Sequence, residues 1–530
     1  MNPPFHVKPK KLDSQGQRNF LRQLSRAKRL VRYAGLLGFL SLRVLGQKSK
    51  RFPLVGITAK AASTLMAVQS QTPLPSRPAE IPDLSLCKFQ EPIELIDLVV
   101  AGSGPGAGVA VRAALNREES VLVVEKGWLP SETVNSHSSA QMFLDFANGG
   151  QDVILSNPVI PYAQGEVWGG GSEVNSGLFH EIPQSILSSW ARSASLDAEI
   201  LRASGKKIRD ELMVSHQDTD ALGIYTKSPL QRIGKGWGWE GGIIPRWRTY
   251  REESFEHHGI SNTHLNNLPS QSSVLGHSFW SFQVLDGVVV SIIKGAGCRH
   301  KLYSKKLCLA AGTIETPAIL LRSKVANIRD FKFQFHAMIR EVAQFSERVN
   351  DLSDIDPHQY WSEDGHEKIG AAVGTPELLR GTLESKGADL PSALENVASY
   401  YISLPSEGKG GLLRLFSDIY PYFLPRKSFR QKCLNAQGRL RSAIADLGGS
   451  LLGDGSLSIS TVHVFGSIPI GNTKLIDNRG YLKSFPNAVY VRDASILPSH
   501  PLVNPQGPLM QLIDALEVSK EVSSEVSSNE

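Results

Sequence analysis

The sequence predicts an α/β fold in more than one domain, and two observations support this. The first is a strand–turn–helix–strand unit between Ile96 and Glu125, an order typical of parallel sheets with crossover helices. The second is the length: 530 residues, 41% hydrophobic and 20% charged, have the composition of a globular protein but exceed one small core. We therefore expect two domains or more.

The unit consists, in order, of a strand, a glycine turn, a helix, a second strand and an acid: Ile96–Ala101, 102–107, 106–116, Val121–Val124 and Glu125. Its glycine turn has the spacing G-x-G-x-x-G/A. Gly102 permits a tight turn, Gly104 lets backbone approach a pyrophosphate, and Ala107 lets helix and strand pack closely. The helix start offers free N–H groups to phosphate. Glu125, 23 positions after Gly102, can accept hydrogen bonds from a ribose. A glycine-rich turn without a ligand is the alternative, but the register of all five parts favours a dinucleotide site.

The net charge of +6 belongs to the N-terminal arm. Residues 1–51 hold 13 Lys or Arg and a single acid, Asp13, so the rest of the chain is net acidic. Arginines threaded between leucines and aromatics over residues 17–46 are compatible with a basic amphipathic helix on an anionic membrane surface. A helix packed across the protein body is the alternative. The apolar run 34–45 is too short to span a bilayer. We expect a cytoplasmic protein, with peripheral binding to the inner membrane surface as the alternative, and no nucleic-acid partner.

The four cysteines are widely spaced and form no C-x-x-C pair. This pattern argues against a disulfide framework and against a zinc site, and it fits a reducing compartment. No metal site is expected.

Three later segments carry further signals. Residues 168–177 contain three successive glycines, which suit close backbone approach to a flat ligand or, equally, a flexible turn. Residues 310–323 indicate a strand-to-helix junction in which Thr313 or Thr316 caps the helix. Near the C-terminus, His463 and Asn504 flank an apolar strand that ends at Asp493. An amphipathic helix is expected over residues 509–522. By itself, a histidine at a strand–loop boundary is more often structural than catalytic.

Together these segments resemble the glucose–methanol–choline (GMC) family of flavin oxidoreductases. Six motifs appear in the family's order: 102–107 with Glu125, G-G-G-S-x-V-N at 169–175, A-G-T-I-x-T-P-x-I-L-L at 311–321, H-x-F-G-S at 463–467, V-x-D-A-S-I-L-P at 491–498 and V-N-P-Q-G at 503–507. The resemblance covers roughly residues 94–522. The first 90 residues fall outside it, and the stretches expected to bind substrate match poorly.

The resemblance implies a Rossmann-like FAD-binding domain interleaved with an α+β substrate domain that has an antiparallel sheet. The expected boundaries are a basic arm and Pro-rich linker (1–90), a discontinuous FAD-binding domain (91–178, 255–325 and 456–522), a substrate-binding domain (179–254 and 326–455) and a disordered tail (523–530).

The resemblance also implies how FAD is held. The expected cofactor-binding residues are Gly102, Gly104, Ala107, Glu125, Gly170, Gly171, Ser172, Asn175, Asp493 and Ala494. In the family, the position of Val174 can be a histidine attached covalently to flavin. Valine cannot form that bond, so non-covalent FAD is expected.

For the reaction, the resemblance implies oxidation of a CH–OH group by hydride transfer to flavin N5. His463 is the expected base, and Asn504 is expected to position the oxygen of a small-molecule alcohol or sugar. The electron acceptor (oxygen, a quinone or another) stays open. His500 is a weaker candidate for lining the site, and His180 is expected at the surface or packed. Two alternatives are a redox-silent lyase built on the flavin fold and a non-enzymatic scaffold docked to a membrane.

Overall fold

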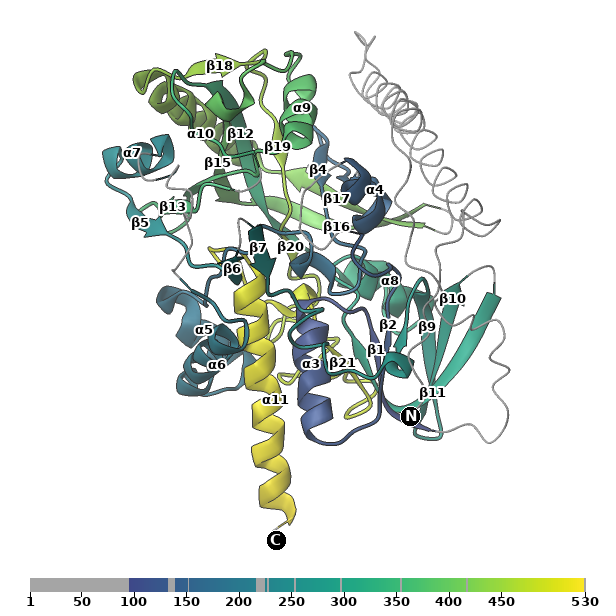
Figure 1. The fold of residues 1–530 in the computed structure, drawn as a ribbon. Helices are drawn as coiled ribbons and strands as arrows, with labels where there is room; N and C mark the ends of the chain where they lie inside the picture. Colours follow the sequence, from purple (N-terminus) through teal and green to yellow (C-terminus); the bar gives the residue numbers. More distant parts are fainter. Residues whose placement is uncertain are drawn as a thin grey trace, which may run out of the picture.

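The computed structural model describes residues 95–131, 139–150, 152–215, 225, 228–251, 254–295, 298–352, 355–415 and 418–528. The basic N-terminal arm and its predicted amphipathic helix lie outside these residues. Within them the chain forms two large sheets with helices packed around them (Figure 1). None of the helices in this part is long and apolar enough to cross a membrane.

The first sheet is mixed, and its parallel part contains the glycine-turn unit. Its strand order is β8 (Ser273–Val274), β2 (Val121–Val124), β1 (Ile96–Ala101), β11 (Cys298–Leu309), β10 (Val288–Gly295) and β9 (Ser278–Leu285), with β21 (Val489–Val491) also paired to β11. β1 runs parallel to both β2 and β11, whereas β10 is antiparallel to its two neighbours. The central strands are buried on both faces, which explains their continuous apolar runs.

The second sheet is antiparallel. Its order is β18 (Ser450–Leu452), β12 (Gln334–Gln344), β15 (Val397–Pro405), β14 (Lys368–Ala371), β13 (His358–Trp361) and β5 (Glu240–Ile243), with β19 (Ile459–Ser460) and β20 (Val464–Phe465) also paired to β12. The long helix α10 (Lys427–Asp446) packs against β12, β15 and β18.

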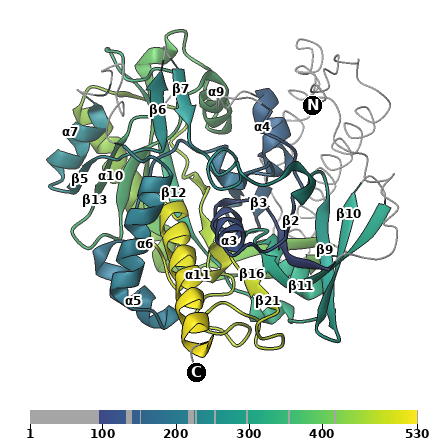
Figure 2. The same cartoon turned by 60° about the horizontal axis from the view of Figure 1, so that its bottom comes forward.

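Helices cover the remaining faces. Besides α10 they are α3 (Pro105–Asn116), α4 (Ser139–Asp145), α5 (Gln184–Ala194), α6 (Ala198–Glu211), α7 (Pro229–Gly236), α8 (Glu315–Arg322), α9 (Pro376–Ser385) and α11 (Gln506–Ser528). Three hairpins complete the described part: β3–β4 (Asp152–Ile154, Ile160–Tyr162), β6–β7 (Arg248–Arg251, Ser254–His257) and β16–β17 (Gly408–Leu415, Asp418–Pro425). Figure 2 shows α11 running alongside α3 and α6, with which it packs.

The fold class predicted from the sequence is confirmed, but two local expectations differ from the structure. Helix α8 begins at Glu315 after an uncapped Ile314, and the hydroxyl of Thr313 donates instead to the Val464 carbonyl, so neither predicted threonine is the N-cap. Residues 523–528, predicted to belong to a disordered tail, continue α11. Extending an anchored helix is easier than nucleating one, because propagation adds a hydrogen bond for each residue fixed.

The predicted division into domains stays a prediction, and one crossing point matters for the site. β19 and β20 lie in the segment assigned to the FAD-binding domain, yet both pair with β12 of the second sheet. Directly after β20 the chain returns to the 494–496 turn, where the Gly466 N–H donates to the Ala494 carbonyl. His463, immediately before β20, therefore lies where the chain passes from the second sheet toward the first.

Candidate active site

The turn between β1 and α3 has the conformation that its glycines predict. Gly102 has φ +100°, and a Cβ there would lie 2.3 Å from the Ala310 carbonyl oxygen. Gly104 is the N-cap of α3, where no side chain caps the helix, and a Cβ on it would meet open space. The closest packing occurs at Gly106, where a Cβ would lie 2.1 Å from the Arg492 carbonyl oxygen, while Ala107 is fully buried. The free N–H groups of α3 therefore face an open volume at Gly104, which suits a phosphate.

Glu125, at the end of β2, organises this turn. It is 7% exposed, and its Oε2 accepts hydrogen bonds from the Ser103 N–H (3.0 Å) and hydroxyl (2.7 Å). Its Oε1 accepts one from the Gly127 N–H at 2.8 Å. Burial raises the pKa of Glu125 despite these donors. Because a carboxylate oxygen has two lone pairs, Oε1 can accept one further hydrogen bond, as from the ribose hydroxyl predicted for this residue.

The glycine-rich loop at 169–175 packs directly on the first turn. A Cβ at Gly170 would lie 2.7 Å from Gly104 Cα, and the Gly169 N–H donates to Ser103 Oγ at 3.0 Å. Gly171, like Gly104, faces open space. Ser172 lies on the protein side of the loop, where its hydroxyl accepts from the Ile260 N–H. The two glycine segments, 66 residues apart, thus form one continuous backbone surface.

Asn175 joins this loop to the start of α11. Its Nδ2 donates to Gln506 Oε1 at 2.7 Å, and its Oδ1 accepts from the Gly177 N–H at 2.8 Å. Gln506 is two residues after Asn504. The loop predicted to lie along the flavin is therefore held to the segment predicted to bind substrate.

Asp493 is the buried N-cap of the 494–496 turn. Its Oδ1 accepts from the Ser495 N–H, and its Oδ2 accepts from the Gly312 N–H (2.8 Å) and the Thr316 hydroxyl (2.5 Å). Burial raises its pKa. Its two oxygens connect two chain segments, whereas the sequence predicts a contact with the cofactor. The Ala494 carbonyl accepts from Gly466, as noted above.

These segments offer a fitting cradle for a dinucleotide. Gly104, Gly171 and Gly312 come from three separate segments, and a Cβ on any of them would meet nothing within 4 Å. Such positions, where backbone borders open space, are where a ligand can approach most closely. The geometry therefore agrees with the predicted cofactor site at the carboxyl ends of β1 and β11.

His463 is paired with a second histidine that no motif indicates. Its Nδ1 lies 2.9 Å from Nδ1 of His336, on β12, and the rings meet edge to face. Two facing nitrogens can form a hydrogen bond only if one carries the proton, so the tautomers of the two rings are coupled. When His463 carries its proton on Nδ1, its Nε2 is an acceptor. His463 is half-buried, and no contact in the described chain occupies that Nε2.

Asn504 is paired with a buried lysine. Lys368 Nζ donates to Asn504 Oδ1 at 2.6 Å, and Lys368 is 2% exposed. Because the amide oxygen faces the ammonium group, Nδ2 is the end of the amide left to donate to a ligand. Burial lowers the pKa of Lys368 to about 7.

Lys368, the partner of Asn504, also acts electrostatically on His463. The pKa of His463 is well below its ordinary value, chiefly because burial disfavours the imidazolium and also because Lys368 repels it. His463 is therefore neutral at pH 7, as a proton acceptor must be, although the lowered pKa makes it a weaker base than the sequence suggests.

Two further histidines surround the pair. The His500 ring lies 4.2 Å from that of His336, centroid to centroid, and its Nδ1 accepts from the Leu502 N–H. His180, expected at the surface or packed, is buried against Trp361 and lies 3.0 Å from Gln359 Oε1. Burial lowers the pKa of both His500 and His180 to about 3.

One face of the second sheet forms a wall of this site. Cross-strand partners share a face, and the register pairs Arg340 with Tyr401 and Lys368 with both Ser403 and Trp361. Alternation along β12 places His336 on the same face as Arg340. Sequence analysis missed His336, Lys368 and Arg340, because only the register between β12, β15 and β14 brings them together.

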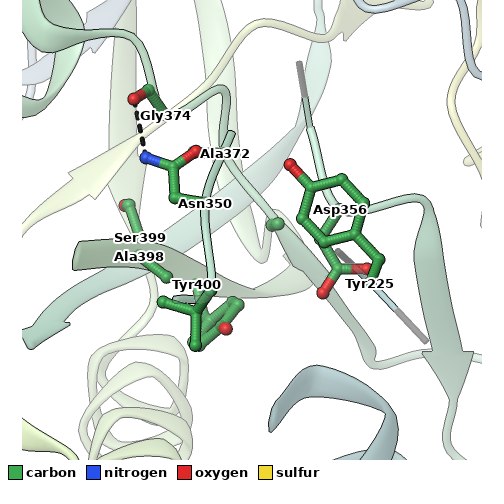
Figure 3. A pocket seen from close by; sticks show the side chains of 10 residues that line it. Tyr225, Asn350, Asp356, Ala372, Gly374, Ala398, Ser399 and Tyr400 are labelled. Atoms are coloured by element: carbon green, nitrogen blue, oxygen red, sulfur yellow. Dashed lines mark hydrogen bonds between the residues drawn. The ribbon is translucent and has the colours of Figure 1, made fainter. Parts of the chain in front are cut away.

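A small cavity lies beside strands β14 and β15 (Figure 3). Its volume is about 10 Å³, and Ser399, Tyr400 and Ala371 contribute to its lining. Asn350 donates across it to the Gly374 carbonyl. The volume suits a single water molecule, so this cavity is not a substrate site.

Comparisons with known proteins agree with this geometry, although no model of a known protein family matches the chain. The chain is 23% identical over 478 residues to an uncharacterized GMC-type oxidoreductase of Sinorhizobium fredii, covering 78% of this chain and 92% of the relative. It is 24% identical over 487 residues to another from Mycobacterium tuberculosis, covering 81% and 76%. Over most of its length the chain is therefore similar to GMC-type oxidoreductases.

Two solved structures have a fold similar to that of this chain. Pyridoxine 4-oxidase from Mesorbium loti superposes with a TM-score of 0.63 at 15% identity, covering 81% of this chain and 99% of that one. Formate oxidase superposes with a TM-score of 0.63 at 12% identity, covering 82% and 99%. A short segment of 101 residues is also 30% identical to a long-chain-alcohol oxidase of Arabidopsis thaliana, covering 19% of this chain and 14% of the relative.

These findings confirm the predicted resemblance and fold, and they support an oxidoreductase with a flavin cofactor. The roles of individual residues stay predictions.

Proposed function

We propose that the chain is an FAD-dependent oxidoreductase that oxidises a CH–OH group, with His463 as base and Asn504 as the group that holds the substrate oxygen. The observation that carries this proposal is that one polar atom of each side chain already has a hydrogen-bond partner. His336 faces His463 Nδ1, and Lys368 faces Asn504 Oδ1. The remaining polar atoms are His463 Nε2, an acceptor, and Asn504 Nδ2, a donor. Together they are complementary to a hydroxyl group.

The chain's own residues would act as follows. Asn504 Nδ2 donates to the hydroxyl oxygen and fixes its position. His463 Nε2 accepts the hydroxyl proton as the carbonyl forms, and the low pKa of His463 favours release of that proton afterwards. Bound FAD would supply the two-electron oxidant, an acceptor for the hydride that leaves the carbinol carbon.

The cofactor would lie on the glycine surface. Gly104 and the start of α3 would meet its pyrophosphate, Glu125 its ribose through Oε1, and the 169–175 loop its ring system. Val174 carries no nucleophile, which supports non-covalent binding.

The test is anaerobic mixing of the purified holoprotein with a panel of alcohols, sugars and hydroxy acids, followed by flavin absorbance. Bleaching by at least one compound is expected. Bound FAD that no member of the panel reduces would contradict the proposal and favour the lyase alternative.

A further inference from the structure

Two cations face the candidate active site from the same sheet face. Lys368 on β14 is 2% exposed, and Arg340 on β12 is half-buried. Tyr401 lies between them: it is the cross-strand partner of Arg340, and its ring centroid is 5.7 Å from Lys368 Nζ. Gly370 gives that ring room, since a Cβ there would lie 2.7 Å from the Tyr401 hydroxyl.

Neither cation has a carboxylate partner in the described part of the chain. Asn504 is the hydrogen-bond acceptor of Lys368, and Arg340 reaches the Met338 sulfur at 3.8 Å, while its Nε is buried without a partner. Two other buried cations each lie next to a carboxylate. Arg492 donates to Glu517 at 2.8 Å, and Lys386 lies 3.6 Å from Glu341.

An unpaired buried cation is unfavourable, because burial removes hydration that no counter-ion replaces. Such groups are found where a ligand supplies the missing charge. The low pKa of Lys368 reflects this cost and is attributable to burial. The electrostatics of the site therefore favour the arrival of an anion.

The neighbouring polar groups cannot supply that charge. Tyr401 is neutral, since burial raises its pKa to about 12, and the histidines are neutral bases. The Nε2 atoms of His336 and His500 are buried and have no hydrogen-bond partner among the described residues. A polar, cationic site with unsatisfied nitrogens is complementary to a small ligand that carries oxygen atoms and negative charge.

We propose that the substrate carries a carboxylate, which Lys368 and Arg340 bind while His463 and Asn504 hold the hydroxyl that is oxidised. This inference rests on the proposed function and names its substrate class as hydroxy acids. It narrows the predicted substrates from alcohols and sugars in general to those that carry a carboxylate.

The experiment compares each hydroxy acid with its methyl ester, which has a similar shape and no charge. Glycolate, 4-hydroxybutyrate and 4-(hydroxymethyl)benzoate are mixed anaerobically with the holoprotein at pH 6.5, and the second-order rate of flavin reduction is measured. At least one acid is expected to exceed its ester by about 10- to 100-fold, the range for a hydrogen bond to a charged group. Esters that react as fast as their acids would overturn the inference while leaving the proposed function intact.

The variant Lys368→Met removes the charge and keeps much of the apolar stem. It should abolish the preference for the acid, Lys368→Arg should retain it, and the exposed control Lys332→Met should leave it unchanged. Equal slowing of acid and ester together with weaker FAD binding would instead assign Lys368 to the cofactor and overturn the inference.

A binding measurement covers the case in which no compound of the panel is oxidised. Benzoate and benzamide are titrated into the holoprotein by calorimetry. Benzoate should bind at least tenfold more tightly than benzamide in the wild type, and equally weakly in Lys368→Met. Equal binding in the wild type would exclude an anion site even if the proposed reaction had failed.

Discussion

His336 and His463 face each other through their Nδ1 atoms at 2.9 Å, although they are 127 residues apart in the sequence. Since only one of the two nitrogens can carry the proton, His336 selects the tautomer of His463. The reactive tautomer requires His336 Nδ1 to be the acceptor, with its own proton on the buried Nε2.

Replacing His336 should therefore impair the base without removing it. We expect His336→Leu to slow flavin reduction roughly 10- to 100-fold, because a hydrogen bond to a group that becomes charged is worth about 1.5–3 kcal/mol. His336→Asn, whose amide can accept at a similar place, should recover part of the rate. Stopped-flow rates across pH 6–9 separate this positioning role from a packing role: rates equal for the Leu and Asn variants would exclude it.

Removing the base itself should have a larger effect. His463→Ala is expected to reduce the rate of flavin reduction by about 10²–10⁴, the usual contribution of a general base. The flavin content of the purified variant should match the wild type, because His463 contacts none of the glycine segments in the described structure. A variant that reduces its flavin at the wild-type rate would remove His463 from this role.

Two neighbouring glycines allow a matched test of the cofactor surface. Gly104→Leu should fold, since Gly104 has φ −67° and its Cβ position is open, but should lose FAD because the side chain occupies the proposed pyrophosphate volume. Gly106→Ala should instead destabilise the apoprotein by about 1–3 kcal/mol, since its Cβ collides with the Arg492 carbonyl. Flavin content and thermal unfolding distinguish the two effects. Undiminished FAD in Gly104→Leu would disprove the placement.

Lys368 should also make stability depend on pH. Its pKa is about 7 in the folded protein and about 10.5 when unfolded, so between these values the unfolded chain binds more protons and stability rises with pH. Between pH 7 and pH 9 the wild type should gain on the order of 2 kcal/mol relative to Lys368→Met. The difference isolates Lys368 from the groups that face it: Arg340, Tyr401, His180, His336, His463 and His500. Urea unfolding at both pH values measures this difference. If the free energy of unfolding changed equally with pH in the two proteins, the prediction would be wrong.

Finally, Val174 predicts the mode of flavin attachment. Acid precipitation of the holoprotein should release all of the FAD into the supernatant, because valine offers no atom for a covalent bond. Flavin absorbance retained in the washed pellet would contradict non-covalent binding.

The sequence by itself determined the elements whose structure depends on local chemistry. The β1–α3–β2 unit could be predicted because apolar runs, turn glycines and the closing Glu125 are contiguous. His463 and Asn504 were found because their motifs resemble those of a family. The sequence could not show that position 106 requires a glycine for packing. The Arg492 carbonyl that leaves no room for a Cβ there comes from a segment far along the chain.

Only the tertiary structure decided which side chains surround the two predicted catalytic residues. His336, Arg340 and Lys368 lie on strands without any motif, and which face each side chain takes depends on the register between β12, β15 and β14. A shift of one residue would turn them all away from the site. Because hydrogen bonding between distant strands sets that register, the cationic wall that suggests a carboxylate substrate is a property of the folded sheet and not of any local stretch of sequence.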